Sequence, residues 1–330
     1  MTLPPPADYA SLKRLMRTRK FIVTGLLLGC LTLAAAEKHW AYRAPERPSL
    51  PRIDTTWPRN AIDWFVLKRL GENGLKPSPE AAPSQLLRRV HLDLTGLPPS
   101  PTDLEAFLKN PSAKAYEAVA DRLLKSPRYG ERWGRHWLDV ARFGESHGYE
   151  SDNERPSAWT YRDAVIRAFN ADLPFDTFIR HSVAGDVLQG DDPLAVALTG
   201  FITSGSTVTN VDGVDREKAK YDKLDDIVSA TGSAFLALTI GCARCHDHKY
   251  DPIAQRDYYR LVGFFLPGGA RDRQIAIGRS GSKVKGLAWN GGNKKKNPLL
   301  ERGDTESKAG DVGLGVLAAL RPDDGLSLIH

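Results

Sequence analysis

The chain has little sulfur and carries none of the common nucleotide or hydrolase signatures. Only three of its 330 residues are cysteine and two are methionine, which excludes a small scaffold held together by disulfides. It contains neither a glycine-rich phosphate loop nor a serine nucleophile elbow. With 41% hydrophobic and 26% charged residues, it still has the composition of a globular protein of one or two domains.

The first 36 residues have the pattern of an export signal. Five basic residues at positions 13–20 precede an apolar run at 21–33, and three alanines follow at 34–36. The run is short for a membrane span, so we predict a cleaved signal peptide over 1–36 and a periplasmic or cell-surface protein. An uncleaved anchor and a lipid on Cys30, in a loose lipobox, are the alternatives. Either one would be the chain's contact with a membrane.

Removal of that segment changes the inventory of charges and ligands. It holds five of the 46 basic and one of the 40 acidic residues, so the remainder has a net charge near +2. Such a balance gives no indication of nucleic-acid binding. Both methionines and Cys30 also lie within it. Cys242 and Cys245 are then the sulfur ligands that remain for a metal or a redox reaction.

Helical periodicity runs through most of the remaining sequence. Four prolines in residues 37–59 predict an extended lead-in. From residue 60 to 266, apolar residues recur three and four positions apart, and the alternation typical of strands is scarce. We therefore predict a mainly α protein whose compact multi-helix domain covers 60–266. The glycine- and lysine-rich residues 267–330 are expected to be a linker that contains strands, or the start of a missing C-terminal domain. Helices are expected at about 62–70, 83–94, 101–108, 116–124, 129–143, 159–170, 175–181, 193–199 and 215–239.

The sequence Cys-Ala-Arg-Cys-His at 242–246 matches the pattern of covalent haem c attachment. In that chemistry two thiols add to the vinyl groups of haem, and the adjacent imidazole ligates the iron. We predict Cys242 and Cys245 as the thioether anchors and His246 as the iron ligand. A zinc ion held by these residues and His248, another metal, a redox-active or structural disulfide, and no cofactor at all are the alternatives.

The opposite face of the iron would need a ligand other than methionine. His136 and His147 are our candidates, from a set that also contains His91 and His181, and five-coordinate iron is an alternative. A histidine at such a position is more often a core or surface residue with a backbone partner. Asp247, His248 and Asp251 follow the motif and are candidates for orienting or capping groups.

A second candidate site lies in residues 145–156, which gather four carboxylates, an imidazole and a phenol. Glu145, His147, Glu150 and Asp152 could bind Ca²⁺, hold a sugar, or act as acid and base. Their spacing is less regular than in an EF-hand, and a solvated loop has the same composition.

Several separate stretches carry a family resemblance: WGRHWLDVAR at 133–142, YRDAVIRAFN at 161–170, AGD at 184–186 and GCARCHDHKYDP at 241–252. Together they resemble the planctomycete cytochrome-associated family, domain of unknown function 1549, over about residues 39–265. The resemblance implies a large exported protein with a cytochrome c-like domain before this one and another uncharacterised domain after it. The chain is then expected to be a fragment whose partners include those domains. No catalytic residue is carried over, because the activity of the family is not established.

Three functions follow as hypotheses. The first is a haem-binding or electron-transfer module of an extracytoplasmic oxidative system that works with a redox partner protein. The second is an extracytoplasmic carbohydrate-active enzyme or binding domain that uses the acidic loop, with the cysteines structural or bound to zinc. The third is a structural or binding module, suggested by the aromatic residues between positions 133 and 161. Whether the protein is an enzyme is left open by the residues.

Overall fold

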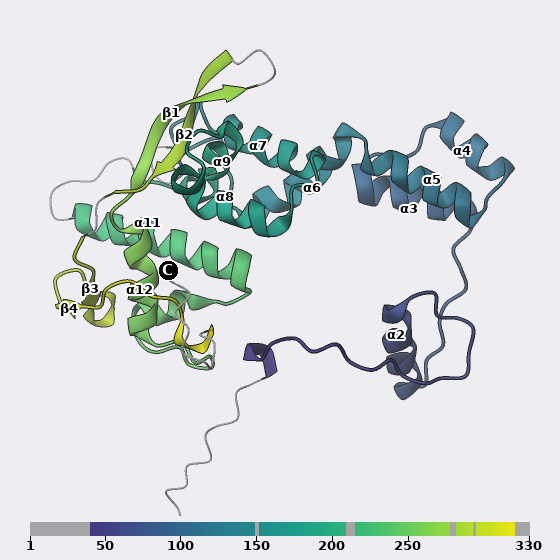
Figure 1. Cartoon of the computed structure of the whole chain (residues 1–330), viewed down its shortest axis with the longest axis horizontal. Helices are drawn as coiled ribbons and strands as arrows, with labels where there is room; N and C mark the ends of the chain where they lie inside the picture. The colour runs from purple at the N-terminus through teal and green to yellow at the C-terminus, as the bar shows by residue number, and fades with distance from the viewer. Residues whose placement is uncertain (1–39, 149–151, 209–214, 278–281, 293–294, 321–330) are drawn as a thin grey trace, which may run out of the picture. The chain divides into compact units, whose positions relative to one another are not determined.

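The computed structural model describes residues 40–148, 152–208, 215–277, 282–292 and 295–320 (Figure 1). The predicted signal peptide and Glu150 lie outside these ranges. The chain divides into two compact units, the first ending at Leu75 and the second beginning at Lys76. None of the helices in the described ranges combines the length and apolar character that a membrane crossing needs.

In the first unit, one α-helix follows the proline-rich lead-in. The unit contains the 3₁₀ turn η1 (Trp40–Tyr42) and helix α2 (Ala61–Glu72). Asn60 starts α2 with a capping box, because its side chain accepts hydrogen bonds from Ile62 and Asp63 while the Asp63 carboxylate accepts from the Asn60 backbone. No residue of α2 is buried, so the helix depends on local capping more than on a core.

The second unit is built mainly from helices, which confirms the predicted mainly α class. Four of its helices in the described ranges begin at proline, which lacks a backbone donor. Serine or aspartate caps several helices and accepts hydrogen bonds from their first backbone amides. The helices are α3 (Pro83–Thr95), α4 (Pro101–Lys109), α5 (Ala113–Leu124), α6 (Pro127–Val140), α7 (Trp159–Asn170), α8 (Phe175–Leu188), α9 (Pro193–Leu198), α10 (Gly200–Thr203), α11 (Asp215–Thr231) and α12 (Gln255–Phe265), with short turns η2 (Gly232–Leu236), η3 (Ile240–Arg244), η4 (Glu301–Gly303) and η5 (Ala318–Leu320).

The helix expected to run to residue 239 ends earlier. The α-helical part of α11 stops at Thr231 and continues as the π-helical turn η2. A side chain at Gly232 would lie 2.7 Å from Ile240, so the chain folds back closely at this point. Ala237, with φ of 54°, then turns the backbone away from the helix axis. The expectation of one continuous helix was therefore wrong, and the break places residues 240–246 against the end of α11.

Two clusters of buried side chains stabilise the second unit. The smaller one joins α3, α4 and α5 through Leu87, Val90, Phe107 and Leu123. The larger one centres on Trp137 of α6, whose indole nitrogen donates to the Tyr161 hydroxyl at 2.9 Å and whose ring packs on Phe178. Burial of aromatic rings with satisfied polar atoms is an effective source of core stability.

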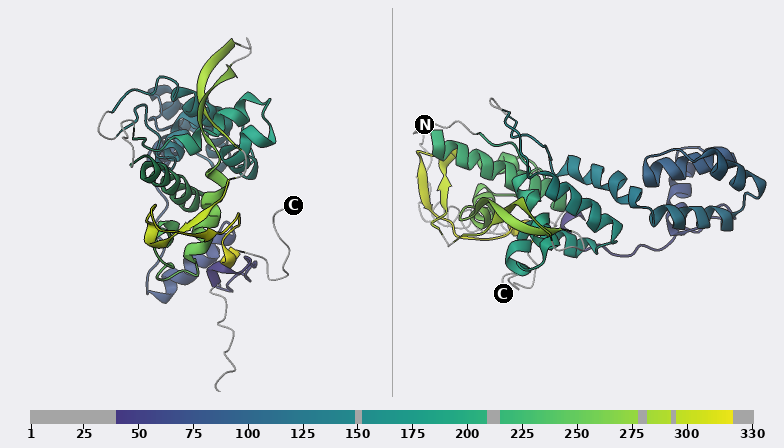
Figure 2. Two further views of the ribbon diagram at one scale, coloured as in Figure 1. Left: turned by 90° about the vertical axis from the view of Figure 1, so that its left-hand side faces the viewer. Right: turned by 90° about the horizontal axis from the view of Figure 1, so that it is seen from above.

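Two antiparallel hairpins complete the larger core (Figure 2). The first pairs β1 (Gly269–Ile277) with β2 (Ser282–Asn290), and the second pairs β3 (Pro298–Leu300) with β4 (Lys308–Asp311). The backbone amide of Trp289 donates to the Thr199 hydroxyl at 3.0 Å, which fixes β2 to the end of α9. Ile275, Ala288, Trp289 and Leu300 are all buried in the same core as the helices. Residues beyond 266 thus complete the helical core.

Replacement of Ile275 tests how far the helices depend on this hairpin. Ile275→Ala removes a side chain that is 2% exposed and packs into the helical core, so we expect a loss of about 2–5 kcal/mol in the free energy of unfolding. Urea denaturation followed by far-ultraviolet circular dichroism measures it. The exposed neighbour Gln274 provides the control, since Gln274→Ala should change stability little. Equal stability of the two variants would mean that the hairpin is not part of the helical core.

Candidate functional site

The Cys-Ala-Arg-Cys-His segment forms one short turn that points its reactive groups outward. Residues 240–244 make the 3₁₀ turn η3, and Cys245 follows it, with its amide donating to the Cys242 carbonyl at 3.4 Å. Ile240 and Ala243 are buried, whereas both cysteines and His246 are exposed. The turn is therefore anchored by its apolar residues and leaves the two sulfur atoms and the imidazole accessible.

Side chains of α12 hold the backbone of this turn. The carbonyl oxygen of Arg244 accepts hydrogen bonds from the Tyr259 hydroxyl and from Nε2 of Gln255, both at 3.0 Å. Gln255 Nε2 also donates to the Leu300 carbonyl at 3.0 Å, which ties the turn to β3. In return, the Asp247 carboxylate accepts from the Gln255 amide at 2.8 Å, at the first residue of α12. The motif is thus locked to α12 from both sides.

The side chain of Arg244 joins the same turn to α11. Its guanidinium bonds Asp222 at 2.6 Å and lies 3.5 Å from Asp225, and its side chain is 19% exposed. Burial alone would lower the pKa of Arg244, but the hydrogen bond to Asp222 and the charge of Asp225 outweigh it and raise that pKa. Tyr258 of α12 also donates to Asp225 at 2.5 Å. A charged network therefore fixes the residue between the two cysteines.

Both cysteines carry free thiols in this structure. Gly303, with φ of 77°, faces Cys245, and a methyl group at that position would lie 3.0 Å from the sulfur. A glycine is needed there both for the left-handed backbone and for the space beside the thiol. The turn η4 thus leaves space beside the Cys245 sulfur.

His246 has a defined tautomer. Its Nδ1 lies 2.7 Å from the carbonyl oxygen of Asp247. Because a carbonyl can only accept, Nδ1 must carry the proton, and Nε2 of the neutral ring then has a free lone pair. This is the arrangement of a metal-ligating histidine that is oriented by a backbone carbonyl.

The neutral ring of His248 is the other tautomer. Its Nδ1 accepts hydrogen bonds from the backbone amides of Asp251 at 2.9 Å and Tyr250 at 3.3 Å, so the proton of the neutral ring is on Nε2. Its side chain is 6% exposed and therefore faces inward. Among the described residues, no group of three or more His, Cys, Asp and Glu side chains is arranged to hold a metal ion. The four residues of the zinc alternative thus do not form a preassembled site.

The candidate distal histidines lie elsewhere in the second unit. His136 is exposed on α6, where its ring meets Trp133 edge to face at 5.6 Å. His147 is partly buried, and its Nδ1 lacks a hydrogen-bond partner in the described part of the chain. Burial lowers the pKa of His147, and the charges of Arg155 and Lys223 lower it further. No hydrogen bond, ion pair or ring contact of the described residues joins either histidine to His246.

The acidic loop uses its described carboxylates for structure. Glu145 forms an ion pair with Arg162 at 2.6 Å, and Asp152 accepts from the Gly148 amide at 3.1 Å. The loop ends are closed by the bridge between Ser146 and Glu154. Glu145, His147, Glu150 and Asp152 were predicted as one site. The structure gives Glu145 and Asp152 separate local partners.

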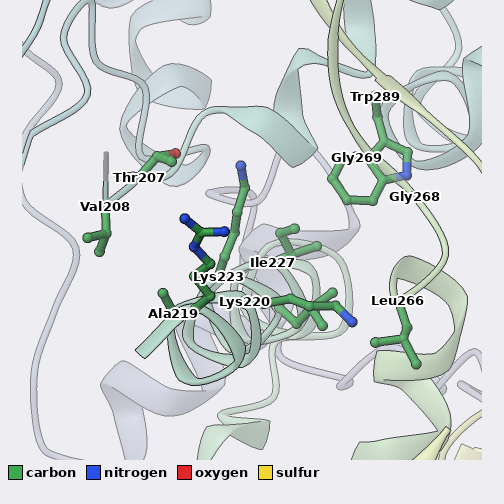
Figure 3. Close-up of a pocket in the computed structure, with 12 residues that line it drawn as sticks. Thr207, Val208, Ala219, Lys220, Lys223, Ile227, Leu266, Gly268, Gly269 and Trp289 are labelled. Atoms are coloured by element: carbon green, nitrogen blue, oxygen red, sulfur yellow. The ribbon is translucent and has the colours of Figure 1, made fainter. Parts of the chain in front are cut away.

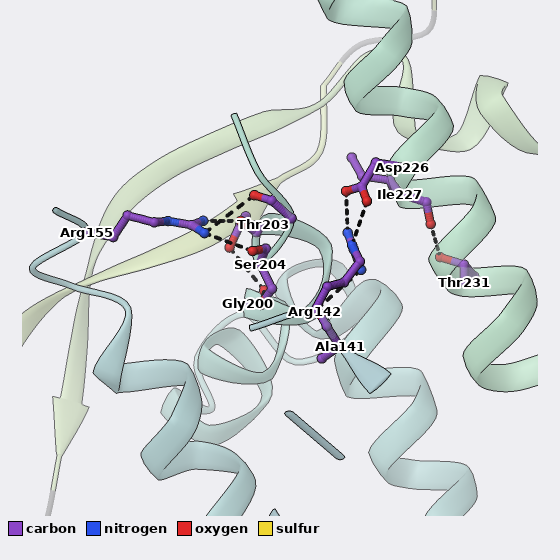
Figure 4. Close-up of polar contacts among 10 residues, drawn as sticks. Ala141, Arg142, Arg155, Gly200, Thr203, Ser204, Asp226, Ile227 and Thr231 are labelled. Atoms are coloured by element: carbon purple, nitrogen blue, oxygen red, sulfur yellow. Dashed lines mark hydrogen bonds and ion pairs between the residues drawn. The ribbon is translucent and has the colours of Figure 1, made fainter. Parts of the chain in front are cut away.

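A cationic cluster next to this loop was not anticipated from the sequence (Figure 4). Arg155 is 6% exposed, and its guanidinium donates to the backbone carbonyls of Thr203 and Ser204 without a carboxylate partner. Arg142 is paired in bidentate fashion with Asp226, at 2.8 and 2.7 Å. Its φ of 51° turns the chain sharply after α6. Arginines in a helical sequence are more often on the surface, so the sequence contains only a weak indication of this cluster.

Comparison with known proteins identifies a family. A family model described as a protein of unknown function (DUF1549) matches residues 61–268. No curated protein and no solved structure matches the chain. The matched range contains the cysteine turn, α11 and the cationic cluster.

Substitution of Arg244 tests whether the charged network fixes the turn. Arg244→Gln removes the cation that Asp222 and Asp225 share and leaves Asp222 with its exposed pair to Lys218, so we expect a loss of about 1–3 kcal/mol in the free energy of unfolding. We also expect faster reaction of Cys242 and Cys245 with a thiol reagent in the folded protein, because the turn is loosened. The control is Arg180→Gln, which breaks the exposed pair with Asp176 and should cost no more than about 1 kcal/mol. Equal effects of the two substitutions would argue against a special role of Arg244.

Proposed function

The chain belongs to the DUF1549 family, and we propose that it is an exported module that carries a covalent c-type haem and transfers electrons to a redox partner. One observation carries the proposal: His246 keeps its Nδ1 proton on the Asp247 carbonyl and thereby presents the lone pair of Nε2 beside two free, exposed thiols. A single turn thus offers the three groups that haem c attachment requires.

The remaining residues of the turn support this arrangement. Cys242 and Cys245 would hold the two thioether bonds, and His246 would ligate the iron. Haem bound in this way would supply reversible one-electron chemistry. Asp247 orients the imidazole, and Arg244, Gln255 and Tyr259 hold the backbone of the turn, so the imidazole and the backbone that carries the two thiols are held in place.

The exposure of the cysteine turn favours electron transfer to a partner protein over catalysis in a closed site. Both thiols and His246 face solvent. Lys220 of α11 lines two neighbouring cavities, and neither has Cys242, Cys245 or His246 in its lining. A group attached here would keep an edge accessible to another protein. Residues 37–330 contain no methionine, so the second axial position would be open or taken by another donor.

Export belongs to the proposal because of the N-terminal pattern and the chemistry. The basic, apolar and small-residue segments at 13–36 have the order of a signal peptide. Haem c attachment needs reduced thiols that meet haem outside the cytoplasm. The signal-like segment and the haem-attachment motif therefore both support a location outside the cytoplasm.

Haem attachment is tested by expressing the full chain in a bacterial periplasm that contains haem-attachment machinery. We expect a haem-sized increase in intact mass and the pyridine haemochrome spectrum of a thioether-linked haem. The Cys242→Ala/Cys245→Ala variant should show neither. His246→Ala should lose the low-spin spectrum of any haem that is still attached, since the iron loses its protein ligand. Colourless wild-type protein at apoprotein mass, in cells where a known cytochrome matures, would contradict the proposal.

Gly303 allows a finer test of the same site. Gly303→Ala places a methyl group against the Cys245 sulfur and forces alanine into a left-handed backbone, so we expect several-fold lower haem incorporation per folded chain. Gly310→Ala is the matched control, because nothing lies within 4 Å of the added methyl and no positive φ is required. Absorbance per mole of purified protein measures incorporation. Equal incorporation in both variants would show that the space beside Cys245 is not needed.

A further inference from the structure

A cavity of about 270 Å³ lies between α11 and the start of the first hairpin (Figure 3). Its apolar wall is formed by side chains that include Leu224, Ile227, Leu266 and Trp289. Lys220 and Lys223 extend from the same helix, and Thr207 and Trp289 lie on opposite sides. The volume is near the lower end of those typical of small-molecule sites.

Among the described residues, the charged side chains that line this cavity are basic. Arg216, Lys220 and Lys223 line it, and none of the described residues in its lining is acidic. The neighbouring cavity shares Lys220 and is mixed in charge, with Lys295, Lys296 and Lys308 beside Glu217 and Asp311. Burial lowers the pKa of Lys220, the charge of Lys295 lowers it further, and the charge of Glu217 acts in the opposite direction. Positive charges gathered in a poorly solvated space attract an anion.

Lys223 is the residue that most needs such a counter-charge. Its ammonium group forms no hydrogen bond or close ion pair with the described residues. Burial lowers the pKa of Lys223, and the charge of Arg155 lowers it further. Asp226 is the acidic group that acts against this shift, but both of its oxygens are already bonded by Arg142. Asp226 is therefore largely neutralised by Arg142.

The apolar wall of the cavity includes the indole of Trp289. The indole of Trp289 fills the space beside Gly268, where a methyl group would lie 2.5 Å from the ring. Glycine at 268 therefore lets the hairpin bring the indole close to the backbone. Aromatic faces stack on flat ligands, and the fixed indole requires little ordering on binding.

We propose that this cavity binds a small organic oxyanion, a carboxylate, sulfonate or phosphate ester on a compact aromatic or apolar body. Lys223 neutralises the oxyanion, Lys220 adds to the attraction, and Trp289 packs against the apolar part. The site is separate from the cysteine turn, because its lining includes none of Cys242, Cys245 and His246. It does not depend on whether haem is attached.

Isothermal titration calorimetry of the full chain tests the proposal with benzoate, 4-methylbenzenesulfonate and phenyl phosphate. We expect at least one of them to bind, and to bind more tightly than the neutral 4-methylbenzyl alcohol or inorganic sulfate. The same affinity is expected in Cys242→Ala/Cys245→Ala, which separates this inference from the haem proposal. Absence of binding by all three anions at millimolar concentration, or equal affinity for the neutral alcohol, would overturn it.

Substitutions of lysine identify the source of the affinity. Lys223→Met should weaken binding of the anion by about tenfold or more, whereas Lys223→Arg, which keeps the charge, should retain most of it. Lys285→Met is the matched control, because Lys285 is 70% exposed on β2 and does not line the cavity. If Lys223→Met does not fold, as judged by circular dichroism, Lys220→Met replaces it, with a several-fold loss expected. Unchanged affinity in the folded variant would refute the assignment.

Discussion

The ion pairs of α11 are the interactions on which the rest of the second unit depends. Asp222 and Asp225 lie one helical turn apart and face Arg244, and Asp226 faces Arg142 at the end of α6. These contacts join segments that are far apart in the sequence. A carboxylate bonded by a bidentate guanidinium is held in direction as well as in distance. One helix therefore positions the cysteine turn on one side and the cationic cluster on another.

The two histidines of the motif show how local backbone contacts determine chemistry. His246 donates from Nδ1 to a carbonyl, whereas His248 accepts at Nδ1 from amides. The exposed ring of His246 therefore has a free lone pair on Nε2, whereas Nε2 of the inward-facing His248 carries the proton. A pair of exposed thiols would not remain reduced for long in an oxidising compartment. If the protein is exported, as we propose, the two thiols would end as a thioether pair, a disulfide or metal-bound thiolates, and the free lone pair on His246 is what haem attachment would use.

Much of the fold could be predicted from the sequence, because its signals are local. Proline at the first position of α3 and α4, a turn at Gly96 and helical apolar spacing predicted α3, α4 and α7 closely. Helix α12 was not predicted, because adjacent buried residues Tyr258 and Tyr259 and the buried Asp257 obscure the periodicity. The cysteine motif could be recognised from spacing alone. The bond between Arg142 and Asp226, 84 positions apart, and the carbonyl contacts of Arg155 have no local signature, so the cationic cluster required the structure.

An unpaired, poorly solvated lysine carries a physical cost that most charged residues of this chain do not. Exposed pairs such as Arg180 with Asp176 contribute little in either direction, because water screens both partners. Lys223 has lost part of its hydration without gaining a bonded carboxylate from the part of the chain that the structure describes, and that loss disfavours the folded state. Methionine would fill similar space without a charge, so packing does not explain a lysine here. Its position between Arg155, Trp289 and an open cavity is explained if the missing counter-charge comes from a ligand.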